Sequence, residues 1–327
     1  MRIQLERFGE KLAVRLADLE AGRLTPAVPR DAATVMVLRD AAPATVAPSA
    51  PPAPGRDSAP GGSGGSSPRE TSLDVAPGTV APSATGRHIQ VLMLRRTAAM
   101  EFAPGAYVFP GGSVDAADYG ADVGWHGPSA QEFGDRLGAT ADVARALVCA
   151  AVRETFEESG VLLAGSPGGG PLAVPSGPSW DADRMAVASG TLSLAELLNR
   201  RGLVLRADLL VPWARWITPI GEPRRFDARF FAAALPDGQV AVRHEAEADH
   251  VAWLRPAAAI DSAKAGEISL LPPTAATLSD FASAAAAGSG LADILGVRRE
   301  ITPIQPRLVL EDGTAWLVLP DGVDYPL

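Results

Sequence analysis

Short runs of apolar residues, separated by polar or glycine-rich segments, predict the strands of a buried sheet. The runs are rich in Val, Leu, Ile, Phe and Trp, which suit strands covered on both faces. They lie at residues 33–38, 89–94, 213–218, 226–235 and 250–254, and a further strand is expected to begin at 161–163. Near the end of the chain, residues 308–310 and 316–319 flank Asp312-Gly313, a dipeptide typical of a hairpin turn.

Other segments place their apolar residues three and four positions apart, which predicts amphipathic helices. One is expected at residues 3–21, on the spacing of Leu5, Phe8, Leu12 and Leu16. Ser193 and Glu196 form a capping-box pattern for a helix that ends near residue 200. Further helices are expected at residues 131–137, 256–265 and 272–287. Because helices and strands follow one another in mixed order, the chain is predicted to be an α/β protein.

The longest helix is predicted within the stretch of residues 141–163, before Gly160, with Thr140 as its N-cap, and its two faces differ in chemistry. One face is apolar and suits a core, with Val148, Val152 and Phe156 at intervals of four. The opposite face carries Glu154, Glu157 and Glu158. Like charges at this spacing destabilise a helix by roughly 0.2–0.5 kcal/mol per pair, whereas a bound divalent cation would make them favourable. The Glu face is therefore either a cation site or a solvated helix end.

Residues 41–86 interrupt the pattern of strands and helices. They consist mainly of Pro, Ala, Gly and Ser, with almost no large apolar side chains. Such a segment cannot bury enough apolar surface to offset the entropy lost on ordering, so we expect a disordered insertion. Because a predicted strand stands on each side, the insertion belongs to a loop within one domain.

Composition and charge narrow the class of protein. The formal net charge of -9 argues against general nucleic-acid binding, which normally needs a basic surface. The start does not resemble a signal peptide, and no apolar run is long enough to span a membrane, so we expect a soluble cytoplasmic protein. Cys149 is the only cysteine, which excludes an intramolecular disulfide. Its position near the apolar face of the helix favours a small buried side chain over a nucleophile.

The Glu-rich helix and a turn upstream of it resemble the signature of the Nudix family, GX5EX7REUXEEXGU. Residues 153–161 read Arg-Glu-Thr-Phe-Glu-Glu-Ser-Gly-Val and are similar to its second half. Residues 112–118 are similar to the first half and follow Phe109-Pro110-Gly111. Asp118 stands where the family usually has Glu, and 34 residues (119–152) separate the halves instead of the usual seven. An interrupted signature of this kind resembles the Nudix subfamily of coenzyme A diphosphatases.

The resemblance implies a Nudix-type α/β/α sandwich around a mixed sheet, with loop insertions and a C-terminal helical and hairpin extension. A Nudix hydrolase domain is expected at residues 31–275, preceded by a helix and linker at 1–30 and followed by the extension at 276–327. The insertion at 119–140 is expected to be a loop and a short helix that leave the two halves of the signature adjacent. Nudix proteins often dimerise, and the N-terminal helix could contribute to a homodimer.

The resemblance also implies a metal site for Mg²⁺ or Mn²⁺. Glu157 and Glu158 would be the main ligands, with Glu154 as a further ligand. The carbonyl oxygen of Gly111 or Gly112 would complete the coordination shell. Carboxylate and carbonyl oxygens select hard divalent cations of this kind.

The sequence offers candidates for the general base in two regions of the chain. Glu154 would serve as the base if it is not a ligand, and Arg153 would orient it through a charge-assisted hydrogen bond. A Glu from a later loop, Glu245 or Glu247, is the alternative. Asp118, which has a shorter side chain than the usual Glu, would act through water or not directly.

A carboxylate-bound cation suits hydrolysis of a phosphoanhydride bond in a small nucleoside diphosphate-linked substrate. Residues 105–112 match a Gly-x-x-x-Phe-Pro-Gly-Gly spacing known from coenzyme A-cleaving Nudix enzymes, although Glu101 stands where that pattern has Arg. Coenzyme A or acyl-coenzyme A is the preferred substrate, and ADP-ribose, NADH and nucleotides are alternatives. A non-catalytic nucleotide-binding module is the alternative to an enzyme. The candidates for binding the substrate phosphates are Arg95, Arg96, Arg224 and Arg225.

Overall fold

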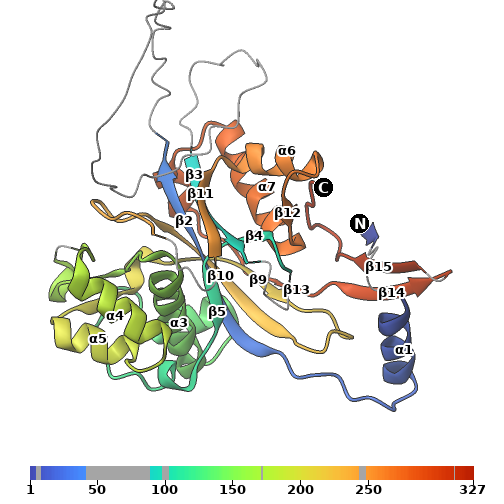
Figure 1. The fold of residues 1–327 in the computed structure, drawn as a ribbon, viewed down its shortest axis with the longest axis horizontal. Helices are drawn as coiled ribbons and strands as arrows, with labels where there is room; N and C mark the ends of the chain where they lie inside the picture. Colours follow the sequence, from blue (N-terminus) through green and yellow to red (C-terminus); the bar gives the residue numbers. More distant parts are fainter. Residues whose placement is uncertain (5–8, 42–88, 98–102, 171, 243–247, 313) are drawn as a thin grey trace, which may run out of the picture.

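A mixed sheet lies between two groups of helices (Figure 1). The computed structural model describes residues 1–327 except for 5–8, 42–88, 98–102, 171, 243–247 and 313, so nearly all of the expected insertion at 41–86 lies outside the described residues. In order across the sheet, the described strands are β12 (Ser269–Leu270), β4 (Ala106–Val108), β3 (Ile89–Arg96), β2 (Arg30–Asp40), β10 (Phe226–Ala234), β9 (Val211–Ile217) and β13 (Pro303–Ile304). Two more lie off this path: β11 (Ala248–Leu254) pairs with β3, and β5 (Gly111–Ser113) pairs with β2.

Strand β2 is the centre of the sheet. It pairs in parallel with β10 along most of its length, and on its other edge it pairs antiparallel with β5 near its start and with β3 near its end. Val35 and Val37 belong to one hydrophobic core, whereas Met36 and Leu38 belong to another. Successive side chains of a strand point to opposite faces, so both faces of β2 are buried, as the apolar run predicts.

Helices cover both faces of this sheet. Helices α2 (Ala130–Leu137), α3 (Ala141–Ser159), α4 (Pro178–Ala188) and α5 (Leu194–Arg201) contribute to the core on the Val35 side. Helices α6 (Pro256–Lys264), α7 (Pro272–Ala286) and α8 (Leu291–Gly296) contribute to the core on the Met36 side. Figure 1 shows the two helical groups on either side of the strands, which confirms the expected α/β/α sandwich. No described helix has both the length and the apolar character that a membrane span needs.

The ends of α3 follow the sequence pattern. The Thr140 hydroxyl accepts a hydrogen bond from the Val143 N–H at 3.3 Å, which confirms the predicted N-cap. At the other end Gly160 adopts a left-handed conformation, with φ of 72°, and its N–H donates to the Phe156 carbonyl. The helix therefore ends just after the Glu-rich face.

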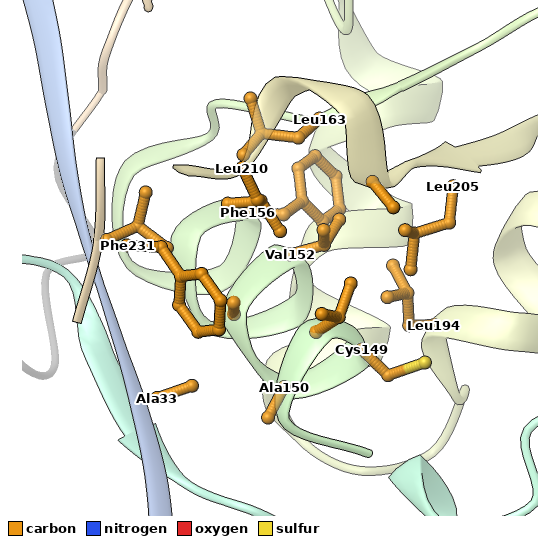
Figure 2. Close-up of a cluster of buried hydrophobic side chains, with 14 of the residues drawn as sticks. Ala33, Cys149, Ala150, Val152, Phe156, Leu163, Leu194, Leu205, Leu210 and Phe231 are labelled. Atoms are coloured by element: carbon orange, nitrogen blue, oxygen red, sulfur yellow. The ribbon is translucent and has the colours of Figure 1, made fainter. Parts of the chain in front are cut away.

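The apolar face of α3 is buried in the core between this helix and the sheet. Val148 and Val152 are fully buried, and Figure 2 shows Val152 and Phe156 among the side chains of this cluster, with Phe231 of β10 beside them. Cys149 lies in the same cluster, and burial raises the pKa of its thiol to about 12. A thiol held protonated inside a core is a poor nucleophile, so the prediction of a buried apolar role is confirmed.

The insertion within the signature packs beside α3. Its predicted helix is α2, and the ring of Phe133 on α2 lies 6.2 Å from the ring of Trp125 and 6.3 Å from that of Phe231. Arg145 of α3 donates to the carbonyl of Ala121 at 2.9 Å. The insertion thus enlarges the helical layer on this face of the sheet. A small sheet in the same region joins β6 (Trp125–His126), β8 (Val204–Arg206) and β7 (Ala164–Gly165).

The N-terminal prediction is partly wrong. The helix expected at residues 3–21 is α1 (Gly9–Glu20), and Leu5 and Phe8 lie outside the described residues. Residues 2–4 form strand β1 (Arg2–Gln4) because they pair with β15 (Thr314–Val318), a partner more than 300 positions away. Strand β15 also pairs with β14 (Arg307–Glu311), which confirms the predicted hairpin.

The strand predicted to begin at residues 161–163 begins one residue later, as the short strand β7 (Ala164–Gly165). Residues 161–163 are fully buried, and the backbone groups of Leu162 are paired by a side chain. The Leu162 N–H donates to the Gln239 carboxamide oxygen at 2.9 Å, and the Gln239 amide nitrogen donates to the Leu162 carbonyl at 2.8 Å. One glutamine therefore satisfies the backbone groups that a neighbouring strand would otherwise pair.

Replacing Gln239 with Ala should destabilise the fold. The Gln239 side chain also donates to the Ala173 carbonyl at 2.7 Å, so truncation leaves several buried backbone groups without a partner. We expect the free energy of unfolding to fall by about 2–4 kcal/mol, measured by urea denaturation. Gln131→Ala is the matched control, because Gln131 is exposed and its side chain donates to Asp135 on its own helix. Equal losses in the two variants would contradict this account.

Candidate functional site

The glycine turn and the Glu face of α3 meet directly. The Gly111 N–H donates to the Glu158 carboxylate at 2.9 Å. A Cβ atom on Gly112 would lie 2.4 Å from Oε1 of Glu154, so only glycine allows this approach. Gly111 is equally confined, since a Cβ there would lie 2.4 Å from the carbonyl oxygen of Ala33 in β2. The two halves of the signature are therefore adjacent, as expected, despite the insertion between them.

Arg153 forms the centre of this arrangement. Its Nη1 donates to Oε1 of Glu154 at 2.9 Å and to Oε1 of Glu157 at 3.2 Å. Its Nη2 donates to the Ser113 carbonyl at 2.9 Å and to Asp118 Oδ2, also at 2.9 Å. The predicted hydrogen bond from Arg153 to Glu154 is present. The same guanidinium also binds Ser113 and Asp118, which belong to the first half of the signature.

Burial and charge compete over the ionisation of Arg153. Burial disfavours the charged form, but the hydrogen bond with Asp118 and the charges of Glu154, Asp118 and Glu157 outweigh it and raise the pKa of Arg153. Arg153 is therefore a permanent cation among the carboxylates.

Asp118 contacts Arg153 directly, and its part in metal binding stays a prediction. Its side chain is only 3% exposed and accepts from Nε of Arg153 at 3.1 Å as well as from Nη2. It also accepts from the backbone N–H of Asp115 at 2.8 Å. A short 3₁₀ turn, Ala116–Asp118, carries it to the guanidinium, so the shorter side chain still reaches. Asp118 is a positioning residue for Arg153.

The chemistry of the carboxylates suits a hard cation. Among the described residues, no group of three His, Cys, Asp or Glu side chains is arranged to hold a metal ion. Glu154 and Glu157 each turn an oxygen toward Arg153, and Glu158 turns one toward the Gly111 N–H. The metal set of Glu154, Glu157 and Glu158 stays a prediction, as do the carbonyl ligands from Gly111 and Gly112.

The structure separates Arg95 from Arg96. They are neighbours on β3, so their side chains point to opposite faces of the sheet. Nε of Arg95 donates to Asp249 at 2.6 Å, and this hydrogen bond raises the pKa of Arg95. Arg96 lies four positions after Leu92 on β3, so both side chains point to the same face. Leu92 belongs to the core on the α3 side, and Arg96 is therefore on the face that carries the candidate site.

The other two arginines also differ in role. Arg225 is buried and donates to the carbonyls of Thr218 at 3.0 Å and Ala27 at 2.8 Å, while burial lowers its pKa. These contacts fasten the loop before β10 to the N-terminal linker, so Arg225 serves the fold. Arg224 is exposed, and its phosphate contact stays a prediction. Glu245 and Glu247, the alternative bases, lie outside the described residues.

Sequence reasoning missed Arg184, which lies on the unpredicted helix α4. Its Nε donates to the Glu157 carbonyl at 2.9 Å, and its Nη2 donates to the Val242 carbonyl at 2.9 Å. A cation near the last carbonyls of a helix is favourable, and this one links the end of α3 to the segment before residue 243. No spacing in the sequence points to it, because the contact joins residues 27 positions apart.

Comparisons with known proteins agree with the geometry. A family model described as the NUDT19 Nudix domain matches residues 129–280. The chain is 32% identical over 240 residues to the acyl-coenzyme A diphosphatase NUDT19 of Gallus gallus, covering 61% of this chain and 62% of that protein. It is 32% identical over 228 residues to the Homo sapiens protein of the same name, covering 59% and 60%. The chain thus spans about three fifths of the length of these relatives.

A solved structure resembles the whole arrangement of elements. It is a NUDIX hydrolase from Alicyclobacillus acidocaldarius, 25% identical in sequence, with a TM-score of 0.57. The match covers 84% of this chain and 98% of that one.

Removing the Asp118 carboxylate should cost stability, because it leaves the buried Arg153 cation short of a partner. We expect Asp118→Ala to lower the free energy of unfolding by about 3–5 kcal/mol, measured by chemical denaturation. Asp115→Ala is the control: that side chain is 67% exposed and lies 3.9 Å from Arg153, so we expect a loss below about 1 kcal/mol. A small loss for Asp118→Ala would show that Arg153 does not depend on it.

Proposed function

We propose that the chain is a Nudix hydrolase, which hydrolyses a phosphoanhydride bond with the help of a divalent cation. The contact of the glycine turn with the Glu face, organised by Arg153, is the observation that carries this proposal. This contact brings the two halves of the interrupted signature next to each other.

Glu157 and Glu158, with Glu154, are the residues that would hold Mg²⁺ or Mn²⁺. When bound, such an ion neutralises charge on the phosphate oxygens and makes a water molecule more acidic. Arg153, fixed by Asp118 and the Ser113 carbonyl, would keep the carboxylates of Glu154 and Glu157 beside the ion.

Glu154 is the favoured general base within this proposal. Its carboxylate is held by Arg153 on one side and lies against Gly112 on the other. A base restrained in this way can accept a proton from an attacking water without first losing rotamer freedom.

We propose coenzyme A or acyl-coenzyme A as the substrate. Two relatives that are 32% identical to this chain are named acyl-coenzyme A diphosphatases. The Gly-x-x-x-Phe-Pro-Gly-Gly spacing of residues 105–112 supports the same class. Cleavage of coenzyme A would yield 3',5'-ADP and 4'-phosphopantetheine, with Arg96 and Arg224 as candidate contacts for the phosphates.

The activity can be tested with the purified chain, Mg²⁺ or Mn²⁺, and a panel of coenzyme A, acetyl-coenzyme A, ADP-ribose, NADH and nucleoside triphosphates. We expect coenzyme A compounds to turn over best, and a chelator to abolish turnover. Glu157→Gln should lower kcat by about 100-fold or more, a loss of about 2.7 kcal/mol of transition-state stabilisation. Glu267→Gln, the same change at an exposed position, should leave kcat unchanged.

The outcomes separate the alternatives. Preference for another diphosphate would replace the substrate and leave the site unchanged. No hydrolysis by folded protein with metal present would favour a nucleotide-binding module instead.

A methyl group at Gly112 should impair catalysis by displacing Glu154. We expect Gly112→Ala to lower kcat by about 10- to 100-fold, equivalent to about 1.4–2.7 kcal/mol. Gly296→Ala is the control, because a Cβ there meets nothing within 4 Å. Wild-type kcat in Gly112→Ala would mean that the position of Glu154 does not matter to turnover.

A further inference from the structure

A network of ion pairs joins strands β2, β10 and β9 near the segment that carries Asp118. Arg229 on β10 is only 2% exposed, and its Nη1 donates to Oδ1 of Asp31 on β2 at 2.6 Å. The same nitrogen lies 3.1 Å from Asp227, which forms a bidentate pair with Arg215 of β9 at 2.9 and 2.7 Å. The parallel register of β2 and β10 sets Asp31 opposite Asp227 and so brings these charges together.

Asp31 contacts both ends of the segment formed by residues 114–119. Its backbone carbonyl accepts from the Val114 N–H at 2.9 Å. Its carboxylate accepts a hydrogen bond from the hydroxyl of Tyr119 at 3.4 Å. Asp118, the residue before Tyr119, holds Arg153. The segment is thus attached to β2 at its start and at its end, with the Arg153 contact between.

A second attachment leads to the same guanidinium. The Ser113 carbonyl accepts from Nη2 of Arg153, and Ser113 pairs with Ala32, the residue after Asp31. Two of the groups that hold Arg153 are therefore fixed to adjacent positions at the start of β2.

We propose that Asp31, held by Arg229, is a positioning residue for the candidate active site. It fixes residues 114–119 so that Asp118 reaches Arg153, which in turn aligns Glu154 and Glu157. The expected effect on turnover rests on the proposed hydrolase function, whereas the effect on the segment does not.

Stability alone does not account for this network. Buried ion pairs are often no more stabilising than apolar residues of similar volume. Among the described residues, Nε of Arg229 has no hydrogen-bond partner although it is buried, and an unsatisfied buried donor carries a cost. The network instead fixes the Asp31 side chain, which contacts the segment of residues 114–119.

A double-mutant cycle tests whether Asp31 acts through Asp118. We expect Asp31→Asn to lower kcat by about tenfold or more, with little change in KM. If it acts through Asp118, adding Asp31→Asn to Asp118→Asn should lower kcat no further, because residues of one network are not additive. Effects on kcat that multiply would overturn the proposal.

The matched control is Asp183→Asn, which breaks another partly buried ion pair. Asp183 on α4 pairs with Arg200 and Arg201 of α5, on elements other than β2 and residues 113–119. We expect it to leave kcat unchanged in both the wild-type and the Asp118→Asn background. Tyr119→Phe, which removes one hydroxyl, keeps the test open should Asp31→Asn fail to fold, and it should show the same lack of additivity with Asp118→Asn.

Hydrogen exchange of the substrate-free protein gives a result that does not depend on activity. We expect Asp31→Asn, or Tyr119→Phe, to speed exchange of the amides in residues 113–119, and Asp183→Asn to leave them unchanged. If the wild-type chain hydrolyses none of the substrates tested, the proposed function fails and exchange alone decides this inference. Unchanged exchange in residues 113–119 would overturn it.

Discussion

The buried guanidinium of Arg153 is the interaction on which the candidate site depends. Carboxylates placed close together repel one another, and this site gathers Asp118, Glu154 and Glu157 around one point. A single planar cation with several donors can satisfy them in different directions, and a lysine, with one compact charge, could not. Because its partners come from both sides of a long insertion, Arg153 also joins parts of the chain that local structure would leave unconnected.

The central strand explains how such an insertion can be accommodated. Strand β2 receives the glycine turn through β5, supports α3 on one face, and presents Asp31 at its start. The two halves of the signature are therefore each positioned against β2 and not through the chain between them. The inserted residues can pack beside α3, through Phe133 and Trp125, without altering the distance between Gly111 and Glu158. Extra length in a loop costs little when both its ends are held.

The arrangement also bears on how the proposed hydrolase would work. Arg153 donates to Glu154 and Glu157, and the Gly111 N–H donates to Glu158. The ties from Asp31, Ser113 and Asp118 matter because they hold Arg153 and the backbone around it beside these carboxylates.

The sequence by itself determined the elements and much of the site. Continuous apolar runs, apolar positions four residues apart, the Thr140 cap and the Asp312-Gly313 turn act over a few residues, so β2, α3 and the C-terminal hairpin could be predicted from them. The signature located Arg153, Glu154, Glu157 and Glu158 on one helix for the same reason. Only the tertiary structure decided the rest. The pairing of Leu162 with Gln239, the attachment of Arg225 to Ala27, and the Asp31–Arg229 pair join residues 77 to 198 positions apart. Local spacing carries no information about such contacts, because they form only when the sheet brings distant strands into register.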